Sequence, residues 1–415
     1  MLLHGARQVG KTHIIRDFGN NHYRNTAYIN LETDPVATTW FDDSIEPARI
    51  IMLLEARIKE RIIPEDTLII FDEIQSCERA LTSLKYFNEN APQYHIAAAG
   101  SLLGVAIKRE KHSFPVGNVD SKTLHPFTFE EFLWTQGEDI LSEEIKNGFS
   151  TNTPLHTSLH NRASDLYKIY LIVGGMPASI LEYIDTNSLV TVPGVQNRII
   201  SDYIADMAKY ASDSEAIRIR AAYNSIPAQL AKENKKFQYK IIQRGGSSTI
   251  FGEAIDWLDT ANIVNKCYNL TTPEIPLEAY KDFTSFKLYM SDTGLLTMGS
   301  RTPQELILSP TETDNRFLGA LAENYVAQHL ATSGNSLLYW RNDSKSGGQA
   351  EIDFILQEGV NPIPVEVKAG MRVKSRSLNT FAKKYSPPYS IRISGKNFGY
   401  ENNIKSVPLY AVFCI

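Results

Sequence analysis

The residues with the clearest chemical meaning lie at the start of the chain. Residues 5–12 read Gly-Ala-Arg-Gln-Val-Gly-Lys-Thr, the Gly-x-x-x-x-Gly-Lys-Thr pattern of a phosphate-binding loop. In such a loop the glycines allow backbone N–H groups to converge on the β- and γ-phosphates at a helix N-terminus. Lys11 would add a positive charge, and the Thr12 hydroxyl would ligate Mg²⁺. The pattern predicts a nucleoside triphosphate site, although eight residues can also match by chance in an unrelated loop.

The predicted nucleotide-binding residues are consecutive in the chain. They are Gly5, Ala6, Arg7, Gln8, Val9, Gly10, Lys11, Thr12 and His13. Because the loop begins so close to Met1, either the chain starts upstream of this residue or its nucleotide domain lacks the elements that usually contact the base.

A second acidic motif follows, in which residues 67–73 read Thr-Leu-Ile-Ile-Phe-Asp-Glu. An apolar run that ends in two carboxylates is typical of a buried parallel strand with acids at its C-terminal end. We expect Asp72 to hold Mg²⁺ through water and Glu73 to polarise the attacking water. The alternative, a strand that merely exits into solvent, is disfavoured by the phosphate loop upstream.

A third strand is predicted over residues 95–99, followed by Gly100 and Ser101. Ser101 would lie between the two acids and the γ-phosphate, where its hydroxyl could report hydrolysis. An ordinary turn serine after a glycine is the other interpretation.

The last hundred residues contain a separate set of charged residues. Glu323 lies in a predicted helix over 318–330, Asp353 lies in an apolar strand, and Glu366-Val367-Lys368 ends another strand. The period of two along a strand places Glu366 and Lys368 on one face, and the hairpin partner would present Asp353 beside them.

This arrangement predicts metal-assisted phosphodiester hydrolysis. Glu323, Asp353 and Glu366 would hold one or two Mg²⁺ ions, while Lys368 would position or help deprotonate the attacking water. For Glu-x-Lys alone, an ion-paired edge hairpin is the favoured interpretation. The position of Asp353 on the hairpin strand opposite Glu366, together with Glu323 on the preceding helix, favours a nuclease-type fold. Whether such a fold would cleave DNA is a separate question.

Basic residues surround this second set. They are Lys368, Arg372, Lys374, Arg376, Lys383 and Lys384. Such a cluster can neutralise phosphates, as DNA binding requires, or can form a solvated basic helix. Trp340 could add base stacking, although a core position is the commoner role for tryptophan.

The elements that must position these residues divide the chain into four predicted segments. Residues 1–135 alternate short strands (27–31, 68–71, 95–99) with helices such as 48–62, which is typical of a parallel sheet covered by helices. Residues 136–195 read as a helical linker or lid. Residues 196–300 read as helices followed by a hairpin, either a winged helix that opens its third helix at Ser248 or a helical lid that touches no DNA. Residues 301–415 form the nuclease-like segment.

Composition narrows the classes of function. The chain has 415 residues, 43% of them hydrophobic, with a net charge of −5, so a nucleic-acid surface must be a local patch. Three distant cysteines offer no zinc-finger spacing and indicate reduced thiols in a cytoplasmic protein. No long apolar run or signal peptide is present, so membrane spanning and export are disfavoured.

The motifs together resemble a prokaryotic family that joins an AAA-type ATPase domain, AAA_14, to a C-terminal domain of unknown function, DUF4143. The resemblance rests on residues 5–12, 68–75, 124–133, 288–295 and 352–368. It implies an ASCE-class P-loop core that binds ATP and Mg²⁺, a winged-helix-like middle and a C-terminal part similar to PD-(D/E)xK nucleases. Adenine rather than guanine follows only from this resemblance. The one candidate arginine finger for a homo-oligomer is Arg109, for which a surface position is the commoner reading.

The sequence therefore predicts an α/β multidomain ATP hydrolase that drives a DNA-binding or DNA-cleaving domain. The alternative is a nucleotide-dependent switch in which slow hydrolysis sets an interaction surface and the nuclease-like fold is a silent binding module.

Overall fold

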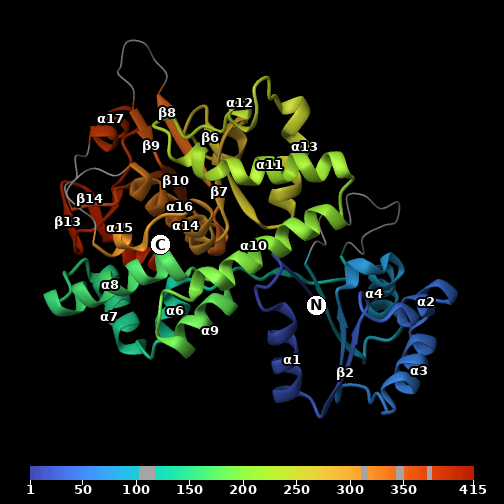
Figure 1. Ribbon diagram of the computed structural model, residues 1–415. Coiled ribbons are helices and arrows are strands. Elements are labelled where there is room, and N and C mark those ends of the chain that lie inside the picture. Colours follow the sequence, from blue (N-terminus) through green and yellow to red (C-terminus); the bar gives the residue numbers. More distant parts are fainter. Residues whose placement is uncertain (102–116, 310–315, 343–349, 372–375) are drawn as a thin grey trace. The chain divides into compact units, whose positions relative to one another are not determined.

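Five short strands in the first part of the chain form a fully parallel sheet. The computed structural model describes residues 1–101, 117–309, 316–342, 350–371 and 376–415, and the chain forms two units (Figure 1). The first unit comprises Met1–His125 with Thr260–Asn262. Its strand order is β2-β3-β4-β1-β5, and every described neighbour pair is parallel. The strands are β1 (Leu2–His4), β2 (Asn25–Asn30), β3 (Thr67–Asp72), β4 (His95–Gly100) and β5 (Ser121–Thr123).

Helices cover both faces of this sheet because its strands are apolar on both sides. Ile69, Phe71 and Ala98 face a core shared with one group of helices, while Leu68 and Ile70 face α1. The helices are α1 (Lys11–His22), α2 (Pro35–Asp43), α3 (Pro47–Ile58) and α4 (Glu78–Asn90), with the short 3₁₀ helix η1 (Ile74–Ser76). The predicted α/β fold with a parallel sheet is thereby confirmed for the first unit. Arg109 lies outside the described residues.

The second unit comprises Pro126–Asp259 and Ile263–Ile415. It begins with a helical layer, α6 to α9, drawn in green in Figure 1. The helices before its first strand are α6 (Phe129–Thr135), α7 (Asp139–Thr151), α8 (Thr157–Val173), α9 (Pro177–Thr186), α10 (Val192–Lys209), α11 (Asp213–Leu230), α12 (Tyr239–Ile242) and α13 (Ser248–Thr260).

Two sheets follow these helices. One is four-stranded with the order β7-β6-β8-β9, and the other is five-stranded with the order β10-β11-β12-β14-β13. The strands are β6 (Val264–Leu270), β7 (Lys281–Met290), β8 (Leu338–Asn342), β9 (Ala350–Ile352), β10 (Phe354–Glu358), β11 (Asn361–Val367), β12 (Ser390–Ser394), β13 (Gly399–Glu401) and β14 (Ile404–Pro408). The intervening helices are η2 (Leu277–Tyr280), α14 (Thr293–Gly299), α15 (Gln304–Leu308), α16 (Arg316–Thr332), α17 (Arg376–Tyr385) and η3 (Leu409–Cys414).

The expected boundaries at residues 195 and 300 do not separate compact units. Strand β6 pairs with β7 on one side and, in parallel, with β8 on the other, so residues 264–290 share a sheet with residues 338–352. The three helices and hairpin expected of a winged helix occur in order as α11, α12, α13 and β6–β7. The hairpin, however, is built into a larger sheet rather than standing free as a wing.

Helix α16 is the central element of the second unit, since every residue from Ala320 to Leu330 is buried. His329 on this helix accepts a hydrogen bond at Nε2 from the backbone N–H of Phe129, at 2.8 Å. Its Nδ1 lies 3.1 Å from the carbonyl oxygen of Tyr325, to which it donates. Burial lowers the pKa of His329 from 6.5 to about 4, so the ring is neutral in this position.

We expect stability to fall on acidification through this histidine. The folded protein binds the proton more weakly than the unfolded chain, so the contribution of His329 is complete above pH 6.5 and is lost as the pH falls towards 4. Compared with His329→Gln, the wild type should lose about 1.4 kcal/mol of unfolding free energy per pH unit in this window. Urea unfolding of both proteins at several pH values measures the difference.

The comparison between the two proteins removes the contribution of Asp292, which acts in the opposite direction because burial raises its pKa to about 6. A constant difference in unfolding free energy between pH 7 and pH 4.5 would contradict the assignment to His329.

Candidate functional site

The phosphate loop connects β1 to α1 through glycines that the backbone requires. Gly5 has φ 143°, and a Cβ at this position would lie 2.2 Å from the carbonyl oxygen of Leu124. Gly10 has φ 97° at the N-cap of α1, a conformation that favours glycine. The loop therefore leads directly into a helix N-terminus, as the sequence predicted.

Lys11, the first residue of α1, is buried. Its Nζ donates to the carbonyl oxygens of Gly5, at 3.1 Å, and Ala6, at 2.8 Å. These contacts hold the ammonium group against the loop that precedes it. His13 is exposed on α1.

Asp72, at the end of β3, accepts hydrogen bonds from three side chains on two elements, α1 and β2. Thr12 Oγ1 lies 3.0 and 3.1 Å from its two carboxylate oxygens. From β2, the Tyr28 hydroxyl donates to Oδ2 at 2.8 Å, and Asn30 Nδ2 lies 3.5 Å from the same oxygen. Thr12 and Asp72, the two expected Mg²⁺ ligands, are thus brought together by the parallel register of β3 beside the loop.

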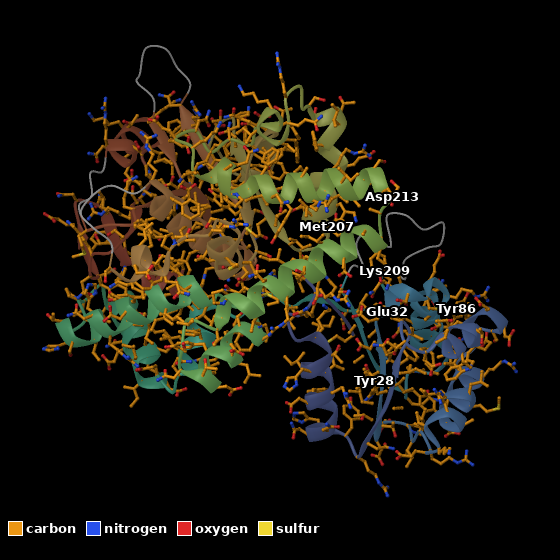
Figure 2. The ribbon with its side chains drawn as sticks, in the orientation of Figure 1. Tyr28, Glu32, Tyr86, Met207, Lys209 and Asp213 are labelled. Atoms are coloured by element: carbon orange, nitrogen blue, oxygen red, sulfur yellow. The ribbon has the colours of Figure 1, made fainter. Side chains whose placement is uncertain are left out.

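Tyr28, labelled in Figure 2, was not identified from the sequence. Burial, followed by its hydrogen bond to Asp72, raises the pKa of its hydroxyl, which stays protonated as a donor. The Arg16 guanidinium lies 4.8 Å from the centre of the Tyr28 ring. The sequence signal for Tyr28 was its spacing from Asn30. The two residues are two apart on β2 and therefore lie on one face of the strand, from which both side chains contact Asp72.

Glu73 follows Asp72 with a left-handed backbone, φ 49°. Its Oε2 accepts hydrogen bonds from Gln75 Nε2 at 2.5 Å and from Ser101 Oγ at 3.1 Å. Gln75 Nε2 also lies 3.4 Å from Ser101 Oγ. The expected proximity of Glu73 and Ser101 is therefore present, and Gln75 is a third member of this cluster that sequence reasoning missed.

His4 lies at the end of β1, next to the loop. Burial and the nearby Lys11 ammonium lower the pKa of its ring. His4 Nε2 lies 3.2 Å from Thr123 Oγ1 on the neighbouring strand β5. The loop is therefore bordered by a neutral imidazole.

The charged residues of the C-terminal region come together at the meeting point of the two sheets. Asp353 separates β9 of one sheet from β10 of the other, and its Oδ2 accepts a hydrogen bond from the Val367 N–H at 2.8 Å. Lys368 Nζ lies 3.2 Å from Glu366 Oε1. The predicted placement of Glu366, Lys368 and Asp353 side by side is present in the structure.

The carboxyl groups of Asp353 and Glu366 differ in their surroundings. Burial and then the nearby charge of Glu323 raise the pKa of Asp353 to about 6. Glu366 is buried, and its Oε2 has no hydrogen-bond partner among the described residues. A buried carboxylate oxygen without a partner is costly, so Glu366 and Asp353 suit a cation.

Glu323 does not complete a three-carboxylate metal site, which corrects the expectation from the sequence. Its carboxylate accepts from the Tyr289 hydroxyl and pairs with Lys235 and, at 3.0 Å, with Lys287. Burial opposes ionisation here, but the ammonium groups of Lys235 and Lys287 hold the pKa of Glu323 well below its usual range. Among the described residues, no group of three or more His, Cys, Asp or Glu side chains is arranged to hold a metal ion.

Lys287 and Tyr289 were missed because they were assigned to a separate domain. The available signal was a lysine inside the apolar run Phe286 to Met290 of β7, which a strand buried on both faces does not admit without a charged partner.

The basic cluster is only partly described, since Arg372 and Lys374 lie outside the described residues. Trp340 is 1% exposed and packs edge-on against Phe381 and Tyr385, so it belongs to the core and offers no exposed stacking surface. Lys384 Nζ lies 5.5 Å from the Trp340 ring centre and 5.0 Å from that of Tyr385.

Comparison with protein families divides the chain into three matched segments. Residues 1–133 match a family described as AAA domain, and residues 164–305 and 318–412 match two domains of unknown function, DUF8612 and DUF4143. The AAA match and the parallel sheet with its phosphate loop show that the first unit has an AAA-type P-loop ATPase-like fold. No curated protein matches the chain.

Several solved structures are similar at low sequence identity. A Walker-type ATPase of Pyrococcus abyssi has 15% identity and a TM-score of 0.42, and the match covers 72% of this chain and 90% of that chain. The Aeropyrum pernix ORC2 protein in ADPNP–ADP complexes has 12% identity and a TM-score of 0.38, covering 79% and 88%. The Aeropyrum pernix ORC1 protein in complex with DNA has 13% identity and a TM-score of 0.28, covering 73% and 86%. Since these scores are low, we base the fold on the topology of the chain itself and on the family match.

None of the described helices combines the length and the apolar composition that crossing a bilayer requires.

We expect Glu323→Gln to destabilise the second unit strongly. The substitution leaves the ammonium group of Lys287, whose side chain is 1% exposed, with one carboxylate fewer. Removing one member of a buried ion pair costs about 3–5 kcal/mol. Thermal and urea unfolding should show this loss. The matched control is Glu401→Gln on β13, an exposed acid whose removal should change stability by about 0.5 kcal/mol or less. Equal effects of the two variants would contradict a structural role for Glu323.

Proposed function

We propose that the first unit binds and hydrolyses ATP with Mg²⁺. The observation that carries this proposal is the convergence of Thr12 on Asp72, beside a phosphate loop whose lysine is already directed at it. Lys11 would exchange its carbonyl partners for phosphate oxygens. Thr12 and Asp72 would hold the ion, which neutralises the developing charge on the phosphates.

Glu73 would be the residue that activates water in this proposal. Its carboxylate is fixed by Gln75 and Ser101, so one oxygen has a defined direction before a nucleotide binds. A carboxylate held in this way can accept a proton from water without reorienting. Ser101 would sense the γ-phosphate through the same hydrogen bond.

We further propose that the C-terminal centre acts on phosphodiesters of DNA, as in a PD-(D/E)xK nuclease. Support comes from the half-satisfied Glu366, the adjacent Asp353, and Lys368 at hydrogen-bond distance from Glu366. A divalent cation bound there would polarise the phosphodiester and lower the pKa of a bound water. Asp353 and Glu366 would hold that cation, and Lys368 would orient the attacking water. Lys383 and Lys384 on α17 would contribute to non-specific phosphate binding.

One observation favours the second candidate, a nucleotide-dependent switch with a silent nuclease-like module. The carboxylate of Glu323 is already neutralised by two lysines, so the centre offers fewer metal ligands than a three-carboxylate site. In this case the first unit would still hydrolyse ATP, and the C-terminal centre would serve binding alone.

ATP hydrolysis should depend on Glu73 more than ATP binding does. Glu73→Gln is expected to lower kcat by about 100-fold or more, because general-base assistance is lost, while ATP affinity stays within a factor of about three. Lys11→Ala should weaken ATP binding itself. Steady-state phosphate release and fluorescent-nucleotide titration separate the two effects. The control is Glu89→Gln on the surface of α4, and a Glu73→Gln protein with wild-type turnover would refute the role of Glu73.

DNA cleavage separates the two candidate functions. Plasmid and single-stranded DNA are incubated with Mg²⁺ or Mn²⁺, with and without ATP, using wild type, Asp353→Asn and Lys11→Ala. ATP-stimulated cutting that both variants lose is the expected result for a coupled ATPase and nuclease. If folded, ATP-binding wild-type protein cuts neither substrate, the switch is the better account.

A further inference from the structure

A lysine side chain lies buried among the carboxylates of the C-terminal centre. The Lys287 side chain on β7 is 1% exposed, and its Nζ lies 3.0 Å from Glu323 Oε1 and 2.7 Å from Glu351 Oε1. Three elements far apart in the sequence, β7, α16 and β9, therefore meet at one ammonium group.

The Glu323 carboxylate is bound by cations or donors at both oxygens. Oε1 accepts from Lys287 and from the Tyr289 hydroxyl, and Oε2 pairs with Lys235. A metal ion could approach this carboxylate only by displacing a lysine. Burying an ammonium group without a partner would cost several kcal/mol, so the contacts with Glu323 and Glu351 are also what make Lys287 tolerable inside the unit.

The acids of the centre thus form two groups with different charge balance. Glu323 and Glu351 face the ammonium groups of Lys235 and Lys287, two negative charges against two positive ones. Among the described residues, Lys368 is the cation at ion-pair distance from the second group, Asp353 and Glu366; it pairs with Glu366, whose Oε2 has no hydrogen-bond partner. Among the described residues of the centre, the excess negative charge and the unsatisfied oxygen therefore lie on the side of Asp353 and Glu366.

We infer that the ammonium groups of Lys287 and Lys235 take the place of a second divalent cation, so that the centre binds a single cation between Asp353 and Glu366. This inference rests on the metal centre proposed above. Glu323 then acts as an anchor for the lysines rather than as a metal ligand. The positive charge beside the bound cation is supplied by the chain itself and does not depend on the concentration of free metal.

The test is the number of Mn²⁺ ions bound by the full-length chain, measured from the EPR signal of free Mn²⁺ without nucleotide. Every protein carries Asp72→Asn, which removes the carboxylate proposed to hold Mg²⁺ at the nucleotide site. We expect one ion for this parent protein and none for the same protein with Asp353→Asn. Lys287→Met should bind a second ion, because Glu323 and Glu351 lose their shared cation, and Lys287→Met with Glu323→Met should return to one.

The matched control is Lys266→Met, which removes another largely buried lysine from two carboxylates, Asp256 and Asp259, outside the centre. It should leave the count at one, because Asp256 and Asp259 are 61% and 39% exposed and water can solvate their carboxylates once the ammonium group is removed. Circular dichroism reports whether each variant is folded. If Lys287→Met does not fold, Lys235→Met replaces it, since the Lys235 side chain is more exposed, at 17%, and its removal also frees Glu323.

Two ions in the parent protein, or a count that stays at one when a folded Lys287 or Lys235 variant is measured, would overturn the inference. Binding of no ion by the parent protein has a different meaning: it would refute the proposed metal centre itself, and the inference with it. The two failures are therefore distinguished by the parent protein alone.

Discussion

Helix α16 has no solvent-facing side over most of its length, and the second unit is organised around the need to satisfy its polar side chains. A buried polar group without a hydrogen-bond partner costs free energy, and the Glu, Asn, Gln and His side chains in the buried part of this helix each have a partner, whereas the Tyr325 hydroxyl has none among the described residues. Asn324 binds both the N–H and the carbonyl oxygen of Met290, at 2.8 and 3.1 Å. Gln328 accepts from the backbone N–H and hydroxyl of Thr293.

The same helix also contacts residues near the start of the unit and two lysines beside the C-terminal centre. His329 fixes the backbone of Phe129 at the beginning of α6, and Gln328 donates to the Tyr170 hydroxyl on α8. Glu323, earlier on the same helix, forms ion pairs with Lys287 and Lys235. The two lysines beside the C-terminal centre are consequently held by the same buried helix that contacts the helical layer and β7.

The first unit depends on a different local constraint, the left-handed backbone of Glu73. A non-glycine residue in this conformation is strained by about 1 kcal/mol or more and persists only where its surroundings hold it. Here Gln75 and Ser101 hold the side chain, while Asp72, the preceding residue, is fixed by Thr12 and Tyr28. Two adjacent carboxylates therefore have different partners, an arrangement that suits the separate roles proposed for Asp72 and Glu73.

The sequence alone determined the phosphate loop, the parallel sheet and the acids at its edge, because these depend on short-range patterns: glycine spacing, apolar runs, and the period of two that places Glu366 beside Lys368. It did not determine the partners of those acids. Tyr28, Gln75 and Lys287 acquire their roles from strand pairing and from contacts between residues far apart in the chain, and no local pattern encodes such contacts. Only the tertiary structure decided that Glu323 faces two lysines, since a buried carboxylate has the same sequence signal whether its counter-ion is a metal or an ammonium group.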